Sequence, residues 1–322
     1  MRRRELLELG AGVLAAGVAG RTGSAIAGRG AKGDAIDAAA FHAMRRFVPT
    51  PFGRIAYVER GSGPAALFFH GWPLNGFQWR GAIERLSGHR RCIAPDFVGL
   101  GYTEAPAGAD VTPSAQTRMM AALLDALSVD MVDIICNDSG GVVAQLFMTL
   151  YPERVRTVLF TTTEVHENNP PPSFRPVIDL ARKGLLELYM LRGGLANYDA
   201  ARGPNALGGA YTDPANLTDE CIETYFRPLI ASPERVAQFN AYTIALDHNE
   251  LVAIAPKLAR FPAPARMLWS ELAQGFPVES AKWLDRTLPK SRGVRVIPGS
   301  KLFFPEEMPD IVAAEALTLW GT

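Results

Sequence analysis

Two side chains that could act as nucleophiles, Asp138 and Ser139, stand side by side between a short apolar run and a pair of glycines. Residues 132–141 read V-D-I-I-C-N-D-S-G-G, and an apolar run with helical spacing follows them. A strand, a polar residue and a Gly-rich helix start are typical of a nucleophile elbow, whose sharp turn lifts one side chain above a sheet. The stretch therefore predicts covalent chemistry by one of these two residues.

The two candidates differ in how well they fit the centre of the elbow. Small residues are needed two positions before and two positions after the nucleophile. Cys136 and Gly140 meet this requirement around Asp138. A centre at Ser139 would instead place the bulkier Asn137 at the crowded position. We expect the carboxylate of Asp138 to be the nucleophile, with a serine hydrolase centred on Ser139 as the alternative.

Alternating strand-like and helix-like segments surround the elbow and predict an α/β fold. Continuous apolar runs at 65–70 and 91–95 indicate strands that are buried on both faces, as in a parallel sheet. Other expected elements are a hairpin within 46–60, strands at 131–136, 155–162, 265–270 and 293–297, and helices at 113–127, 278–288 and 305–320. In a doubly wound sheet, functional loops follow the carboxyl ends of the strands.

The middle of the chain differs from the segments on either side of it. Residues 165–249 contain Pro170-Pro171-Pro172, Gly-rich patches and helical stretches, and they show no clear strand pattern. We expect this segment to be a helical cap inserted into a core formed by 46–164 and 250–322. Such a cap would cover a cleft and exclude water from it.

The first residues of the chain predict an export signal. Arg2-Arg3-Arg4 precede a mildly apolar run over residues 10–19 and an A-x-A site at Ala25-Ile26-Ala27. Together these features are typical of a twin-arginine signal peptide over 1–27, followed by a linker over 28–45. The apolar run is too short for a permanent membrane anchor. We expect a periplasmic or secreted protein; a frayed amphipathic helix or a mis-assigned start codon is the alternative.

Composition excludes several classes of partner and cofactor. The chain has 322 residues, with 33 basic and 33 acidic side chains, and this balance argues against a nucleic acid or an anionic membrane. Its three cysteines are too few for a disulfide framework. The five histidines lack metal-ligand spacing, and no dinucleotide fingerprint follows the first buried strand. We expect no cofactor and a small-molecule substrate as partner, and the oligomeric state stays open.

Five short motifs are spread along the chain. They are H-G-W-P at 70–73, P-D-F-V-G-L-G at 95–101, the N-D-S-G-G elbow at 137–141, Y-P-E-R-V at 151–155 and F-F-P-E-E at 303–307. In type and in order these motifs resemble those of the α/β-hydrolase superfamily, and most closely those of its Asp-nucleophile branch of haloalkane dehalogenases and epoxide hydrolases. The resemblance implies an α/β-hydrolase fold, with a mostly parallel eight-stranded sheet flanked by helices and an inserted helical cap.

The resemblance also implies roles for particular residues. In this family a carboxylate attacks an electrophilic carbon to form an ester, and a His oriented by a second carboxylate activates water against that ester. The nucleophile then corresponds to Asp138, and the oxyanion donors to the backbone N–H groups of Trp72 and Ser139. The second carboxylate corresponds to Glu164, because the other position used in the family holds Glu271 and no Asp pair. The implied substrates are small apolar electrophiles, namely epoxides, alkyl halides or esters.

The general base is where this sequence departs from the family. The pattern P-G-x-H-x-F-F after the last strand reads P-G-S-K-L-F-F at 298–304, so Lys301 stands at the His position. A lysine is an ammonium near neutral pH and is therefore a poor general base. An ion pair between Lys301 and Glu164 would then replace the usual pair of His and carboxylate.

This replacement leaves several functions open. A recruited histidine could act as the base, with His166 as the first candidate and His248 as the second. Without a base, an ester on Asp138 would persist. The protein could also be a non-hydrolytic ligand-binding protein that has kept the fold. The serine esterase centred on Ser139 is the third possibility.

The groups that would receive the leaving atom are also unusual. Dehalogenases often carry Asn after His-Gly and Trp after the nucleophile, but these two positions hold Trp72 and Ser139. The Trp72 indole could donate to a halide, whereas a second donor would have to come from the cap. Epoxide hydrolases use cap tyrosines to protonate the opening oxygen. The cap segment offers Tyr189, Tyr198, Tyr211, Tyr225 and Tyr242.

Overall fold

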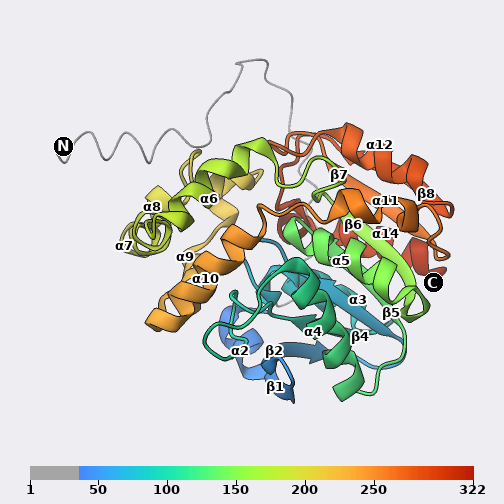
Figure 1. Ribbon diagram of the computed structural model, residues 1–322. Coiled ribbons are helices and arrows are strands. Elements are labelled where there is room, and N and C mark those ends of the chain that lie inside the picture. Colours follow the sequence, from blue (N-terminus) through green and yellow to red (C-terminus); the bar gives the residue numbers. More distant parts are fainter. Residues whose placement is uncertain (1–35) are drawn as a thin grey trace.

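One eight-stranded sheet forms the centre of the protein (Figure 1). The computed structural model describes residues 36–322, so the predicted signal peptide over 1–27 lies outside the described part. The strands follow the order β1-β2-β4-β3-β5-β6-β7-β8, in which β2 is antiparallel to both neighbours and all other pairs are parallel. The predicted eight-stranded, mostly parallel sheet is confirmed. Its strands are β1 Arg45–Thr50, β2 Gly53–Arg60, β3 Ala65–Phe69, β4 Arg91–Pro95, β5 Val132–Asn137, β6 Val155–Thr161, β7 Ala265–Ser270 and β8 Ser291–Ile297.

Helices cover this sheet in two groups. In one group α3 packs against α14, and in the other α5 packs against both α4 and α11. The core helices are α2 Ala38–Met44, α3 Arg80–Leu86, α4 Pro113–Ala126, α5 Ser139–Leu150, α11 Leu251–Leu258, α12 Val278–Thr287, α13 Phe304–Glu307 and α14 Pro309–Trp320. Because helices cover both faces of the parallel strands, every residue of β3 and of β5 is buried, which explains the continuous apolar sequence of β3.

The chain between β6 and α11 is largely helical and lies beside the sheet, on the left in Figure 1. In this segment α6 packs against α10. Its main helices are α6 Arg175–Arg182, α7 Gly193–Ala196, α8 Tyr198–Ala201, α9 Asp219–Phe226 and α10 Pro233–Ala245. We call residues 165–249 the cap. One large cluster of buried apolar side chains runs through the sheet, the core helices and the cap.

The last predicted helix differs from the observed structure. The sequence predicted one helix over 305–320, but α13 and α14 are separated at Met308, whose φ of −127° and ψ of 53° are not helical. Pro309 explains the break, because it has no N–H to donate and disfavours the helical conformation of the residue before it.

The register of the sheet decides which loops meet. Phe69 at the end of β3 pairs with Cys136, and Asn137 at the end of β5 pairs with Thr161. The loops that follow β3, β5 and β6 therefore emerge side by side at one edge of the sheet. Among the described residues, no helix is both long and apolar enough to cross a bilayer.

Candidate active site

The sharp turn between β5 and α5 is centred on Asp138. Its φ of 50° and ψ of −137° lie outside the helical and extended regions, whereas Ser139 is already the first residue of α5. A non-Gly residue with positive φ is uncommon and marks a constrained backbone. The turn also requires close packing, because a Cβ on Gly140 would lie 2.5 Å from the carbonyl oxygen of Phe69. The backbone therefore has the elbow geometry predicted around Asp138.

The loop after β3 brings a backbone donor to this carboxylate. The N–H of Trp72 donates to Asp138 Oδ2 at 2.7 Å, and the backbone N–H of Ser139 also reaches the carboxylate. The Gly71 carbonyl accepts from the N–H of Leu74 at 2.9 Å, which fixes the peptide unit that carries the Trp72 N–H. The two predicted oxyanion donors thus converge on Asp138 itself.

Asp138 and Glu164 form a buried pair of carboxyl groups. Their exposed fractions are 6% and 5%. Burial raises the pKa of Asp138 to about 7, although hydrogen bonds from the N–H groups of Ser139 and Trp72 oppose this shift. Burial also raises the pKa of Glu164 well above its usual value, and the negative charge of Asp138 raises it further. Because each charge disfavours the other, the pair binds a proton readily near neutral pH.

Neighbouring side chains hold Glu164 beside the elbow. Thr163 Oγ1 donates to the carbonyl oxygen of Asp138 at 2.8 Å and lies 3.5 Å from Glu164 Oε2. Gln145 Nε2, from α5, donates to the carbonyl oxygen of Glu164 at 2.8 Å. A Cβ on Gly141 would lie 1.9 Å from Thr163 Oγ1, so the start of α5 packs directly on this segment. The segment after β6 is therefore fixed to the elbow at several points.

Lys301 does not pair with Glu164. Within residues 36–322, neither Asp138 nor Glu164 forms an ion pair with a lysine, arginine or histidine. The expected ion pair between Lys301 and Glu164 is therefore wrong. Lys301 is only half-buried, whereas Glu164 is buried, and pairing them would cost the hydration of the ammonium. Its backbone N–H donates to Thr212 Oγ1 in the cap at 3.1 Å. The loop after β8 is thereby held against the cap.

The two histidines considered as replacement bases, and His70 in the loop after β3, have other contacts. The ring of His166 stacks on that of Trp283 in α12, with centroids 4.5 Å apart, and His248 is exposed. His70 is fully buried, where its Nε2 accepts from the N–H of Phe97 at 3.1 Å and burial lowers its pKa. In the described structure, no hydrogen bond or ion pair joins any of these three rings to Asp138 or Glu164.

The indole of Trp72 is engaged by the cap. Its Nε1 donates to Thr243 Oγ1 at 3.0 Å, so the expected role as a halide donor is not supported by this geometry. The ring stacks on Phe239 with centroids 5.9 Å apart, and it meets Phe174 edge to face at 4.8 Å. The Trp72 ring is therefore packed among aromatic side chains of the cap.

Of the five cap tyrosines, Tyr242 is the one that reaches the elbow. Its hydroxyl lies 3.4 Å from Ser139 Oγ, its exposed fraction is 1%, and its pKa is raised by burial and by the charges of Asp138 and Glu164. Sequence spacing offered no means of choosing it, because α10 meets the elbow only in the folded protein.

The other four tyrosines lie elsewhere. Tyr211 and Tyr225 donate to the buried carboxylate of Glu306 at 2.7 and 2.9 Å, and Arg80 forms an ion pair with the same group. The Tyr198 hydroxyl donates to a glutamate on the cap surface, and Tyr189 is exposed. We call Glu306 and its three partners the Glu306 cluster; it joins the cap to α3 and α13.

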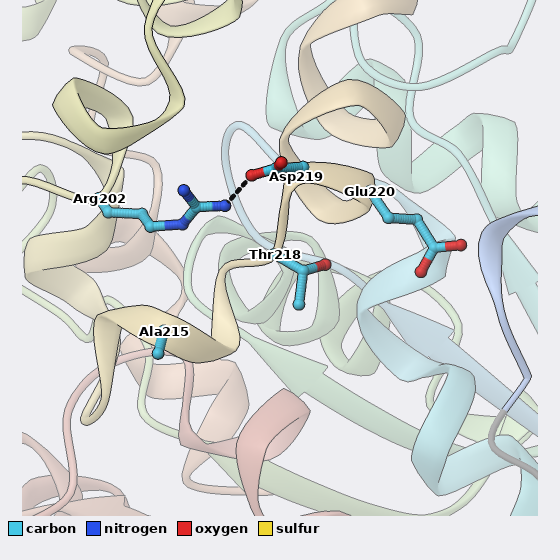
Figure 2. A pocket seen from close by; sticks show the side chains of 5 residues that line it. All are labelled: Arg202, Ala215, Thr218, Asp219 and Glu220. Carbon is cyan, nitrogen blue, oxygen red and sulfur yellow. Dashed lines mark hydrogen bonds and ion pairs between the residues drawn. The ribbon is translucent and has the colours of Figure 1, made fainter.

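Two surface hollows lie away from these residues. One, of about 660 Å³, is on the cap and is shown in Figure 2. Its lining residues are Arg202, Ala215, Thr218, Asp219 and Glu220. The other, of about 560 Å³, lies beside α14. Arg202 and Asp219 pair with each other in the first hollow. The carboxyl pair of Asp138 and Glu164 instead lies buried beneath the cap.

Comparison with known proteins supports this assignment of the fold. Residues 64–307 match the family model described as alpha/beta hydrolase fold. The chain belongs to this family. Among its relatives, haloalkane dehalogenase 2 from Mycobacterium tuberculosis is 28% identical over 294 residues, which cover 86% of this chain and 94% of that protein. Epoxide hydrolase 2 from Siraitia grosvenorii is 35% identical over 120 residues, 35% of this chain and 37% of the relative.

A solved structure gives the same picture for this α/β-hydrolase. An alpha/beta hydrolase fold protein from Burkholderia ambifaria superimposes with a TM-score of 0.72 over 85% of this chain and 97% of that one, at 22% identity. At this identity the likeness shows the fold alone. Relatives named as a dehalogenase and an epoxide hydrolase support the prediction of a hydrolase.

Proposed function

We propose that this protein hydrolyses small apolar electrophiles through a covalent ester on Asp138. The hydrogen bond from the Trp72 N–H to the Asp138 carboxylate carries this proposal. If a serine were the nucleophile, oxyanion donors would be expected to await the substrate's carbonyl oxygen. Here they bind the oxygen of the carboxylate, which is where negative charge would develop when water attacks an aspartyl ester.

The reaction would run in two steps. First, the ionised carboxylate of Asp138 attacks carbon, and the bond from that carbon to the leaving atom breaks, with its electron pair going to the leaving atom. Water then attacks the carbonyl carbon of the ester, and the resulting oxyanion is held by the N–H groups of Trp72 and Ser139. Collapse breaks the bond to the alcohol oxygen, which takes a proton and leaves, so the carboxylate is regenerated.

Glu164 is proposed to exchange the protons that a histidine would handle in other members of the family. Its raised pKa makes it a proton donor while Asp138 is ionised. Esterification of Asp138 removes the neighbouring negative charge, and Glu164 then gives up a proton more readily. In that state its carboxylate could accept a proton from the attacking water.

Epoxides are the substrates that this site suits best. An opening epoxide leaves an alkoxide that needs a proton, whereas a halide leaves as a stable anion that needs hydrogen-bond donors. The Tyr242 hydroxyl donates to Ser139 Oγ at the long distance of 3.4 Å, and rotation of its O–H bond could direct the proton to an opening epoxide oxygen instead. The Trp72 indole N–H is bound to Thr243 at 3.0 Å and would have to break that hydrogen bond to bind a halide.

Intact-mass and product analysis tests this function. The protein and its Lys301→His, Asp138→Ala and Ser139→Ala variants would each be incubated with a panel of epoxides, haloalkanes and small esters. We expect diol from epoxides, no adduct with Asp138→Ala, and activity retained in Ser139→Ala. A stable adduct that turns over only after Lys301→His would show that the nucleophile works without a base. Loss of activity only in Ser139→Ala would instead favour a serine esterase.

Export remains a proposal that rests on residues 1–27. If the twin-arginine signal works, the mature protein should be found in the periplasm or medium, and replacing Arg2 and Arg3 by lysine should retain the full-length chain inside the cell. Cell fractionation followed by N-terminal mass analysis would decide this.

A further inference from the structure

A pair of buried amide side chains, Gln78 and Asn137, lies directly behind the nucleophile. Gln78 belongs to the 3-10 turn Gly76–Trp79, and Asn137 is the last residue of β5. Their exposed fractions are 1% and 0%. Gln78 Nε2 donates to Asn137 Oδ1 at 2.6 Å. A buried amide must satisfy its donors and its acceptor inside the protein, so the partners of this pair are decisive.

The outer ends of the pair reach the loops of the candidate site. Gln78 Oε1 accepts from the N–H of Gly71, beside Trp72, at 2.9 Å. Asn137 Nδ2 donates to the carbonyl oxygens of Thr161 and Thr162 at the end of β6, and to that of Leu302, beside Lys301, at 3.2 Å. The pair therefore links the loop after β3, the end of β5, the end of β6 and the loop after β8.

The orientation of both amides follows from their partners. The N–H of Gly71 requires an acceptor, which places Oε1 of Gln78 toward it and Nε2 toward Asn137. Asn137 must then present Oδ1 to Gln78, and its Nδ2 faces backbone carbonyls that can only accept. Reversing either amide would place like groups against one another, so the chain of hydrogen bonds has one consistent direction.

We propose that Gln78 and Asn137 are positioning residues, which set the oxyanion donor at Trp72 and the loop of Lys301 in register with Asp138. This inference rests on the proposed function for its catalytic consequence, but not for its structural one. Gly71 accounts for the sensitivity of the arrangement, because a Cβ there would lie 2.7 Å from Asp138 Oδ2. With so little clearance, a small shift of the loop would move the Trp72 N–H away from the carboxylate.

Gln78→Met tests the proposal, because it keeps the length of the side chain and removes both polar ends. Gln116→Met is the matched control: Gln116 is also fully buried, and it also bonds backbone groups, accepting from the Val98 N–H at 3.0 Å and donating to the Val98 carbonyl at 2.9 Å. Both variants lose buried hydrogen bonds, but only Gln78→Met breaks the link between the site loops.

The first readout is amide hydrogen exchange, which needs no substrate. We expect Gln78→Met to speed exchange both in residues 70–75 and in residues 299–304, while Gln116→Met leaves both segments unchanged. The second readout is the rate at which the ester on Asp138 is hydrolysed, the step in which the Trp72 N–H would hold the oxyanion. This rate should fall about tenfold to a hundredfold in Gln78→Met, in kcat more than in KM. Adding Asn137→Ala to Gln78→Met should cost little more, because one linked unit has already been broken.

The two readouts separate the two proposals. Faster exchange in only one segment, or equal effects of the two methionine variants, would overturn the positioning role. If the unmodified protein forms no adduct, the proposed function fails, while faster exchange in both segments would still support the link. Full additivity of Gln78→Met and Asn137→Ala in the rate of ester hydrolysis would also count against a single unit.

Discussion

Asp133 and Asp138 lie at the two ends of β5 and are both buried, but their electrostatic surroundings are opposite. Asp133 accepts charged hydrogen bonds from Arg90 Nε at 2.8 Å and from Arg156 Nη1 at 2.7 Å. Asp138 has no cation paired with it within the described part of the chain, and its carboxylate accepts backbone N–H groups. One strand thus carries an ion-paired carboxylate near its start and, just after its end, the unpaired carboxylate that we propose as the nucleophile.

This contrast predicts opposite effects on stability. The pKa of Asp138 is higher in the folded protein than in the unfolded chain, so its contribution to the free energy of unfolding falls as pH rises from about 4 to about 7. Asp138→Asn should therefore raise the free energy of unfolding by about 4 kcal/mol at pH 8 and by about 2 kcal/mol at pH 5. Asp133→Asn should lower it by about 3 kcal/mol. Urea unfolding at both pH values measures this, and a destabilised Asp138→Asn at pH 8 would contradict it.

The same pKa predicts the pH dependence of the first chemical step. Only the ionised carboxylate attacks carbon, so the rate of ester formation should rise with pH and level off above a midpoint near pH 7. The pKa of the Tyr242 hydroxyl is raised, so its ionisation should not produce a falling limb in the neutral range. Single-turnover mass analysis between pH 5 and 9 checks this. A midpoint near pH 4 would mean that burial does not perturb the nucleophile.

Tyr242→Phe should separate epoxides from alkyl halides. Loss of the hydroxyl should slow epoxide opening by about a hundredfold, because the alkoxide then lacks a proton donor. Reaction with an alkyl halide should change little. The control is Tyr189→Phe, whose ring is exposed on the cap. Parallel rate measurements with one epoxide and one bromoalkane test the difference, and equal losses with both would mean that Tyr242 acts only through packing.

Gly71→Ala should abolish ester formation without unfolding the protein. The new methyl group would lie 2.7 Å from both Cβ and Oδ2 of Asp138, so either the loop or the carboxylate must move and the Trp72 hydrogen bond is lost. Gly88→Ala is a suitable control, because a Cβ on Gly88 would have no neighbouring atom within 4 Å. Circular dichroism checks the folding of both variants. Normal adduct formation in Gly71→Ala would show that the close packing of Gly71 on Asp138 is not needed for ester formation.

The Glu306 cluster should contribute more to stability than a surface ion pair does. Glu306→Gln leaves Arg80 without its ionic partner in a buried site, and we expect the free energy of unfolding to fall by about 3 kcal/mol. Asp310→Asn removes a pair with Arg85 at a position where the Asp310 side chain is 70% exposed, and should cost under about 1 kcal/mol. Thermal and urea unfolding compare the two variants. Similar losses of unfolding free energy in the two variants would mean that the Glu306 cluster stabilises the protein no more than a surface ion pair does.

Local patterns predicted the sheet and the elbow well, because both follow from short-range chemistry. The apolar runs that became β3 and β4, and the small residues around Asp138, are visible within a few positions of the sequence. The break before α14 could also have been predicted from Pro309. The ion pair between Lys301 and Glu164 was expected from the types of the two residues alone. In the folded chain Lys301 is half-buried and Glu164 is buried, and they do not pair.

Contacts between distant segments were beyond such reasoning. Tyr242 meets Ser139 across the closed cap, and Gln78 meets Asn137 through the packing of a turn on β5. Polar residues of these types occur throughout the chain, and only the register of the sheet and the docking of α10 distinguish the ones at the site. Three-dimensional packing therefore identified the hydroxyl that we propose as the proton donor and the pair that we propose as positioning residues.

The hydrogen bonds between the loop after β8 and the cap limit how this protein can diversify. The N–H groups of Lys301 and Phe303 donate to Thr212 Oγ1 and to the Ala210 carbonyl, and Glu307 accepts from the N–H of Thr212. A chimaera that received a new cap while keeping its own loop would lose these partners and displace the residue at the position of the general base. The cap and the loop after β8 therefore have to change together. A chimaera made to obtain a new substrate range should exchange residues 165–249 together with residues 300–307.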